Sequence, residues 1–421
     1  MPPTCVSTTP RKEPGAVADV VTKSPVEIEV GLLTGCQDRH YAFGLAMAVV
    51  SKGVRLDVIG GDEVDSPELH STPKLRFLNL RGSQRSEASF QEKTSSLLAY
   101  YARLLIYAAG SKAKILHILW NNKFELFDRT LLMLYYKAMG KKITLTAHNV
   151  NQGRRDENDS LLNRLTLTIQ YRLADHIFVH TEKMKSELHR DFSVPDQAVT
   201  VLRYPINNAF PDTALSPAEA KQQLGIRANE KTILFFGRIR PYKGLEHLLD
   251  AFRTIVKKDL NYRLIIAGES KKGSEKYIDE IRQRVHLEFN EENILLKVQF
   301  IPDEEMELYL KAADVLVLPY KEIFQSGVLF LAYSFGLPVV ATDIGSFREE
   351  IIEGRTGFLC KPGDPIDMAQ TIETYFSSDL YRDLSRRRQD IRDYAYSHHS
   401  WDAVGDLTRS VYVELLRTRL L

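Results

Sequence analysis

Two cationic side chains follow an apolar run near the middle of the chain. Gly237 and Arg238 come directly after the apolar residues 233–236. Lys243 and Gly244 come next and precede a segment of helical periodicity. Glycine lets a ligand approach the backbone closely, and a helix start offers free N–H groups and the positive end of a dipole. Two cations beside such a start favour a diphosphate ligand, although most Arg and Lys side chains are simply solvated.

A second loop could meet the same phosphates from the opposite side. It follows the apolar residues 315–318 and leads into an apolar segment that we expect to be a buried helix. The backbone donors of a helix start would suit a phosphate, but an ordinary Ser N-cap explains the pattern equally well. The candidate ligand-binding residues of this loop are Glu322, Gln325, Ser326, Gly327 and Val328.

Polar residues in the first half of the chain could face the same ligand. Gly35, Asp38 and Arg39 follow the first expected strand, where they could bind sugar hydroxyls or form a polar surface loop. His148 and Asn149 close a later strand, and a histidine at a strand end is placed to meet a ligand. A structural histidine is the alternative for His148.

The elements that would position these residues alternate between strands and helices, which predicts parallel sheets covered on both faces. We expect helices over residues 42–50, 129–139 and 244–256. The expected strands are 27–33, 54–59, 115–119, 142–146 and 177–179, and then 232–236, 262–267, 294–301, 315–318 and 338–342. The fold class is therefore α/β, with two doubly wound Rossmann-like domains whose strand ends face a shared cleft.

The length of 421 residues also favours two domains. We predict a disordered leader over residues 1–26 and an acceptor-side domain over residues 27–206. A nucleotide-sugar-binding domain would span 207–400, and an amphipathic helix over 401–421 would pack back on the first domain.

Composition narrows the function classes. The formal charge of +1 gives no reason to expect a nucleic-acid partner. Three widely spaced cysteines indicate neither a zinc site nor a disulfide framework, so we expect a reducing, cytoplasmic location. The apolar runs are far shorter than the roughly 20 residues needed to span a bilayer. Four basic residues of the first domain could still place the protein at the inner face of the membrane: Arg154, Arg155, Arg164 and Arg172. Ordinary solvated charge explains them as well.

Four segments taken together resemble a known family. They are FFGRIRPYKGLEHLLDAF, AADVLVLPY, QSGVLFLAYSFGLPVVATDIGSFREEI and EGRTGFLCKPGDP, and they occur in this order within residues 235–365. The chain is similar in these segments to the C-terminal half of family 4 retaining glycosyltransferases, which have the two-domain GT-B architecture. The resemblance in layout extends from about residue 27 to the end.

The resemblance implies roles for the residues above. Arg238 and Lys243 would contact the donor diphosphate, the amides of residues 326–328 would reach its distal phosphate, and His148 would contact the donor sugar. Many members carry two glutamates where this chain has Ile323 and Leu331, so Gln325 or Glu322 would substitute for them. The resemblance also implies retention of anomeric configuration. The sequence has no evident Asp-x-Asp at a matching strand end, which favours a reaction without a metal or other cofactor.

The expected function is transfer of a sugar from a nucleoside-diphosphate sugar to a glycan, lipid-linked or small-molecule acceptor, in polysaccharide or glycoconjugate biosynthesis. Two other classes remain open. A nucleotide-sugar epimerase or a phosphorylase could use the same architecture. A catalytically silent nucleotide-binding protein would agree with the absent glutamates.

Overall fold

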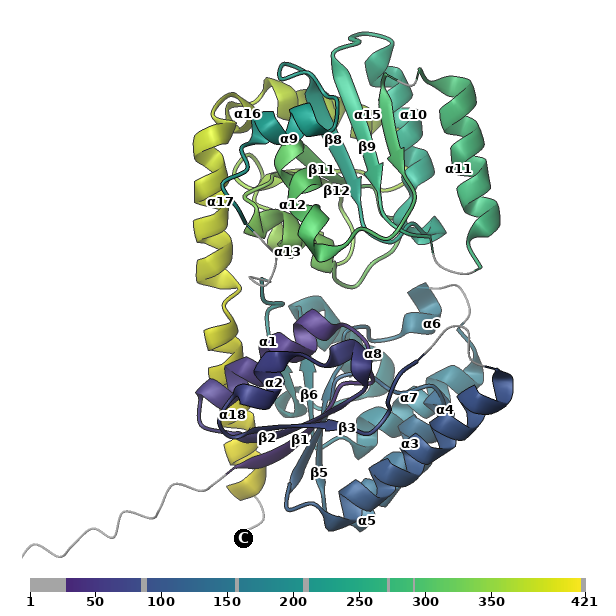
Figure 1. The fold of residues 1–421 in the computed structure, drawn as a ribbon, viewed down its shortest axis with the longest axis vertical. Coiled ribbons are helices and arrows are strands. Elements are labelled where there is room, and N and C mark those ends of the chain that lie inside the picture. The colour runs from purple at the N-terminus through teal and green to yellow at the C-terminus, as the bar shows by residue number, and fades with distance from the viewer. Residues whose placement is uncertain are drawn as a thin grey trace, which may run out of the picture.

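The computed structural model describes residues 28–84, 89–155, 159–206, 212–270, 273–290 and 292–417. These residues form two α/β domains, one above the other in Figure 1. The expected leader over residues 1–26 lies outside the described residues, as do residues 418–421 of the expected last helix. No helix in the described ranges combines the length and the apolar character needed to cross a bilayer.

The first domain is built on a seven-stranded sheet in which every neighbouring pair is parallel. The strand order is β3-β2-β1-β4-β5-β6-β7. The strands are β1 (Glu29–Leu33), β2 (Arg55–Gly60), β3 (Leu75–Asn79), β4 (Ile115–Ile118), β5 (Lys142–Thr146), β6 (His176–Val179) and β7 (Val199–Val201). The helices are α1 (Arg39–Ser51), α2 (Pro67–Ser71), α3 (Phe90–Gly110), α4 (Glu125–Phe127), α5 (Met133–Ala138), α6 (Gln152–Arg155), α7 (Leu161–Leu173) and α8 (Glu182–Phe192), with a π-helical segment η2 (Asp128–Leu132) joining α4 to α5.

The second domain is built on a six-stranded parallel sheet of order β10-β9-β8-β11-β12-β13. Its strands are β8 (Lys231–Phe236), β9 (Tyr262–Ala267), β10 (Ile294–Lys297), β11 (Val315–Leu318), β12 (Val339–Thr342) and β13 (Gly357–Cys360). The helices after residue 212 are α9 (Pro217–Gln223), α10 (Leu245–Val256), α11 (Glu275–Glu288), α12 (Asp303–Ala312), α13 (Gly327–Ser334), α14 (Phe347–Glu350), α15 (Pro365–Ser377), α16 (Asp379–Arg382), α17 (Leu384–His398) and α18 (Trp401–Arg417).

Both sheets reverse their strand order at one point, between β1 and β4 in the first domain and between β8 and β11 in the second. In open α/β sheets, ligands bind outside the carboxyl ends of the strands at such a reversal. The two parallel sheets confirm the expected α/β fold class. Strands β3, β7 and β13 were not expected from the sequence, and each forms an edge of its sheet.

The last helix returns to the first domain. Helix α17 packs on α13 of the second domain, whereas α18 packs on α1 of the first. Small residues permit this close packing, because a Cβ added to Gly44 would lie 2.1 Å from Trp401 and one added to Gly405 would lie 2.7 Å from the carbonyl oxygen of Ala48. Helix α18 therefore completes the core of the first domain.

The chain passes between the domains twice, and the two crossings are bonded to each other. The amide of Ile206 donates to the carbonyl oxygen of His399 at 3.0 Å. The Nδ1 atom of His399 in turn lies 2.9 Å from the carbonyl oxygen of Tyr204. The domains are thus joined at one paired connection.

Candidate functional site

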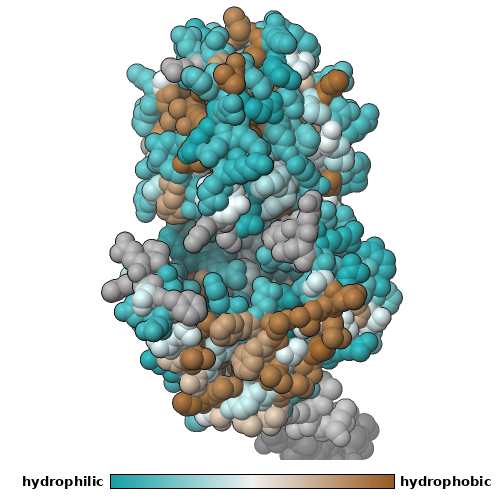
Figure 2. Space-filling view, turned by 90° about the vertical axis from the view of Figure 1, so that its right-hand side faces the viewer, coloured by the Kyte–Doolittle hydropathy of each residue, from teal (hydrophilic) through white to brown (hydrophobic). Residues whose placement is uncertain are grey.

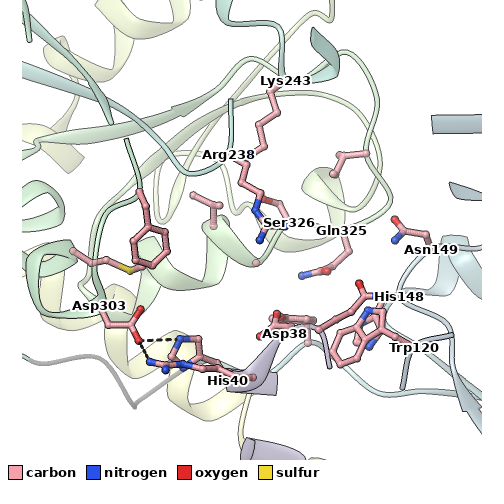
Figure 3. Close-up of a pocket in the computed structure, with 18 of the residues that line it drawn as sticks. Asp38, His40, Trp120, His148, Asn149, Arg238, Lys243, Asp303, Gln325 and Ser326 are labelled. Carbon is pink, nitrogen blue, oxygen red and sulfur yellow. Dashed lines mark hydrogen bonds and ion pairs between the residues drawn. The ribbon is translucent and has the colours of Figure 1, made fainter. Parts of the chain in front are cut away.

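A cleft of about 1120 Å³ lies between the two domains. Its walls come mainly from the loops after β1, β4 and β5 in the first domain and after β8, β10 and β11 in the second (Figure 3). These loops include both points at which the strand order reverses. The sequence-predicted residues that line the cleft are Asp38, Arg39, His148, Asn149, Arg238, Lys243, Gln325, Ser326, Gly327 and Val328.

The other predicted residues lie nearby but not on this wall. Gly237 lines a smaller adjoining cavity of about 350 Å³. Gly244 has φ +63°, and an added Cβ would lie 2.1 Å from the carbonyl oxygen of Pro319, so it permits the β8 and β11 loops to touch. Gly35 similarly packs against Trp120. Glu322 is among the residues that line neither cavity.

Arg238 and Lys243 both reach the cleft, in different environments. The Arg238 side chain is about two-thirds exposed, and its Nε donates to Glu269 at 3.1 Å. Lys243 is buried, with its Nζ 5.0 Å from the centre of the Tyr320 ring. The face of an aromatic ring attracts a cation. Lys243 therefore holds a fixed, poorly hydrated charge, whereas Arg238 can move to meet a ligand.

His148 is oriented by a chain of hydrogen bonds. The Nδ1 atom of His180 lies 2.9 Å from the carbonyl oxygen of Leu202, which can only accept, so this nitrogen carries the proton. The Nε2 atom of a neutral His180 is then an acceptor, and it lies 3.0 Å from Nδ1 of His148. His148 must therefore be protonated at Nδ1 and have a lone pair at Nε2.

Burial keeps both imidazoles neutral. It lowers the pKa of His180 to about 4. Burial, and then the neighbouring His180 and His117, lower the pKa of His148 well below its ordinary value. The ring of His148 stacks on Trp120 with centres 4.2 Å apart, and the edge of Tyr41 contacts it at 4.7 Å between centres. Its buried Nε2 has no hydrogen-bond partner among the described residues. It can accept a hydrogen bond from a hydroxyl.

The loop after β11 supplies further polar groups. Gln325 has a buried Nε2 without a hydrogen-bond partner in the described part of the chain. Ser326 precedes α13, and its side chain makes no capping bond, so Gly327 and Val328 begin a helix whose first amides are available at the cleft wall.

Ile323 and Leu331 occupy the two positions at which the resembled family often carries glutamates. Ile323 lines the main cleft and Leu331 the smaller cavity, and both are largely buried. Neither can bind a ribose hydroxyl. Because Glu322 does not line either cavity, Gln325 is the better placed of the two proposed substitutes.

Arg39 bridges the cleft. It makes an ion pair of 2.5 Å with Asp303 at the start of α12, and His40 lies 3.1 Å from the same carboxylate (Figure 3). Asp38 caps α1 by accepting from the amide of Tyr41 at 3.1 Å. In the described structure, Arg39 of the first domain therefore contacts Asp303 of the second domain.

Sequence reasoning did not select His180 or Asp303. Thr181, next to His180, forms the N-cap of α8, so the sequence around His180 is typical of a helix start and does not indicate a ligand-binding residue. Asp303 is 264 positions from Arg39, and no local pattern connects them.

Two facing Rossmann-like domains with a cleft between them are the architecture of the GT-B class of protein. Residues 217–398 match the family model described as "Glycosyl transferases group 1". The matched segment covers most of the second domain, and the chain is a glycosyltransferase with the GT-B fold. The prediction of a glycosyltransferase is confirmed.

Several relatives cover most of the chain, and two of them are described here. An uncharacterized glycosyltransferase of Methanocaldococcus jannaschii is 23% identical over 94% of this chain and 97% of its own length. A D-inositol 3-phosphate glycosyltransferase of Corynebacterium diphtheriae is 25% identical, with 88% of each chain covered.

Solved structures share the fold. Sucrose-phosphate synthase from Thermosynechococcus elongatus superimposes with a TM-score of 0.74 at 18% identity, covering 93% of this chain and all of that chain. Anabaena HepE in complex with UDP-glucose superimposes with a TM-score of 0.71 at 16% identity and the same coverage.

Proposed function

We propose that the protein transfers a sugar from a nucleoside-diphosphate sugar to a hydroxyl group of an acceptor, with retention of the anomeric configuration. The observation that carries this proposal is the meeting of three groups in one cleft. Arg238 and Lys243 come from the second domain, and the unpaired Nε2 of His148 comes from the first.

The second domain would bind the donor. The two cations and the first amides of α13 approach the same space from different loops, and together they suit a diphosphate. The UDP-glucose complex of HepE, which shares the fold, supports a nucleotide-sugar donor of this kind. Gln325 would donate from its Nε2 to an oxygen of the donor.

The chemistry requires charge stabilisation at the leaving group. The bond between the anomeric carbon and the phosphate oxygen breaks, and its electron pair stays on the diphosphate. Arg238, Lys243 and the α13 start would stabilise this developing charge, which is why we propose a reaction that needs no metal or other cofactor. The acceptor oxygen attacks from the same face, and its proton passes to the departing phosphate oxygen.

His148 would position the donor sugar. A neutral imidazole whose Nδ1 is already bonded to His180 can only accept at Nε2. It would therefore accept a hydrogen bond from a sugar hydroxyl, and it has no proton to give to a leaving group. Its stacking on Trp120 fixes the direction of that bond.

The acceptor would enter from the first domain, beside Asp38 and Asn149. We propose a glycan, a lipid-linked sugar or a small polyol as its chemical class, with a role in polysaccharide or glycoconjugate biosynthesis in the cytoplasm. The name of the Corynebacterium diphtheriae relative makes D-inositol 3-phosphate one acceptor to include.

The test is release of nucleoside diphosphate from UDP-, GDP- and ADP-sugars, with and without acceptors and with and without EDTA. The anomeric configuration of the product would be read by NMR. Donor-dependent release that His148→Ala lowers and EDTA does not would support the proposal. Conversion of the donor sugar without an acceptor would favour an epimerase. Tight nucleotide binding without release would favour a silent binding protein.

A further inference from the structure

A broad apolar surface covers one side of the first domain. The chain has seventeen large hydrophobic residues that are exposed in the described structure, and ten of them fall between residues 98 and 165. They form what we call the leucine face: Leu98, Ile106, Phe124, Leu126, Leu131, Leu134, Met139, Leu161, Leu162 and Leu165. Figure 2 looks onto this side of the molecule, and brown, apolar residues spread across the first domain.

The helices that carry the leucine face are packed side by side. Tyr101 of α3 stacks on Phe124, which directly precedes α4, with ring centres 5.7 Å apart. Arg129 of η2 donates to Asn163 of α7 at 2.8 Å. The exposed residues are therefore carried by neighbouring elements, α3, α4, η2, α5 and α7. Helices α3, α4, α5 and α7 lie on one side of the first domain in Figure 1. Contiguous apolar surfaces of this extent are rare on proteins that have no partner for them.

The same region carries a strong positive charge. Residues 90–173 contain thirteen Lys and Arg against six Asp and Glu, a formal +7 in a chain of +1. Lys123 and Arg172 are exposed on or next to the elements that carry the leucine face, and Arg164 is exposed but pairs with Asp159 at 2.6 Å. Apolar side chains with Lys and Arg among them are typical of helices that lie at the surface of an anionic bilayer. A symmetric contact with a second copy would instead bring these like charges together.

The leucine face is also joined to the cleft. The hydroxyl of Tyr171 on α7 donates to the carbonyl oxygen of Val150 at 2.6 Å, and Asn163 donates to the side chain of Asn151 at 2.9 Å. Helix α7 thereby holds the loop that leads from His148 and Asn149. A surface that docks through α7 would bring this edge of the cleft to the bilayer.

We propose that the leucine face docks the protein on an anionic lipid bilayer. The inference that the acceptor then reaches the cleft from the bilayer edge rests on the proposed function, whereas docking itself does not. Apolar side chains enter the interface between headgroups and acyl chains, while the basic side chains contact anionic headgroups.

The test is co-sedimentation of the full chain with vesicles of phosphatidylcholine, with or without phosphatidylglycerol. The docking variant combines Ile106→Ser, Leu131→Ser and Leu161→Ser. These three residues are 72%, 62% and 87% exposed. The matched control is Leu260→Ser with Leu287→Ser and Ile366→Ser, at 69%, 71% and 67% exposed, outside the leucine face. Both variants should fold, since every site is solvated.

We expect the wild type and the control variant to bind the anionic vesicles, and the docking variant to bind them at least about tenfold more weakly. High salt should weaken wild-type binding. Equal binding by the docking variant, or no binding by the wild type, would overturn the proposal. So would a wild-type dimer that the docking variant converts to a monomer without any change in vesicle binding. Release of nucleoside diphosphate with a water-soluble acceptor should be the same in all three proteins, so failure of the transferase proposal would be seen separately.

Discussion

Replacing Lys243 with methionine tests the proposed role of the cleft most directly. The side chain is buried, so its charge is not screened by water as that of Arg238 is. Two unit charges about 4 Å apart interact by about 4 kcal/mol at an effective dielectric constant of about 20. Because kcat/KM compares the transition state with the free enzyme and free donor, the whole interaction counts, and its loss should cost about 3–4 kcal/mol. The expected fall in kcat/KM is therefore about 10²–10³-fold.

The protein should stay folded when this charge is removed. Methionine fills a similar volume, and it does not carry the desolvation penalty of a buried ammonium group. We therefore expect an unchanged or higher Tm for Lys243→Met by calorimetry. Lys321→Met is the matched control, because Lys321 lies on the neighbouring loop, pairs with Glu246 and does not line the cleft. It should retain kcat/KM within about threefold, since exposed charges are screened.

The assay is continuous detection of released nucleoside diphosphate, with whichever of the UDP-, GDP- and ADP-sugars serves as the donor. Comparable losses in Lys243→Met and Lys321→Met would refute the reasoning, because a general loss of positive charge would then explain both. A loss below about tenfold in Lys243→Met with an unchanged Tm would also refute it.

Three further changes have defined outcomes. The unfolded chain protonates His180 near pH 6.5, but the folded chain does so only near pH 4. The contribution of His180 to the free energy of unfolding is therefore complete above about pH 6.5 and falls by roughly 3 kcal/mol as the pH drops toward 4. Calorimetry would measure this fall. Asp303→Ala should free Arg39, open the cleft and raise the donor KM about threefold at low salt, with a larger radius of gyration in X-ray scattering. Gly44→Ala should lower stability by about 2 kcal/mol, measured by urea unfolding, because its Cβ would lie 2.1 Å from Trp401.

Each of these changes has a control in the same chain. His180→Gln removes the buried imidazole and should reduce the acid slope of stability. Glu305→Ala removes a charge from the same helix start as Asp303 but has no described ion pair across the cleft, so the KM should not move. Gly110→Ala meets nothing within 4 Å and should not destabilise the protein. If the acid slope persisted in His180→Gln, or if either of the other two variants changed the measured property as much as the variant it is paired with, the role assigned to the corresponding contact would be wrong.

The central strands could be predicted from the sequence because they are buried on both faces. Residues 262–267 and 315–318 are nearly continuous apolar runs, and the observed strands have those same bounds. The edge strand β3 was missed because it is half-exposed and its residues, LRFLN, mix apolar and polar types. Strand β10 ends at Lys297, four residues before the expected end, because the chain turns toward α12.

The candidate site was predictable where function depends on position along a strand. Arg238 and Lys243 follow a buried strand, so their place at the cleft follows from the topology. The partnership of His148 with His180 depends on the pairing of β5 with β6. No spacing in the sequence encodes which strands become neighbours, or which tautomer a histidine takes.

Helix α18 has a consequence for the order in which the protein folds during synthesis. Its Trp401 packs against Gly44, and its Tyr412 hydrogen-bonds to the buried His117 at 2.6 Å. The first domain therefore depends on residues that leave the ribosome after the second domain, which has all of its strands by residue 360. The later-encoded domain can finish its core first. Until α18 emerges, the side of α1 that it covers in the folded protein is left open to solvent.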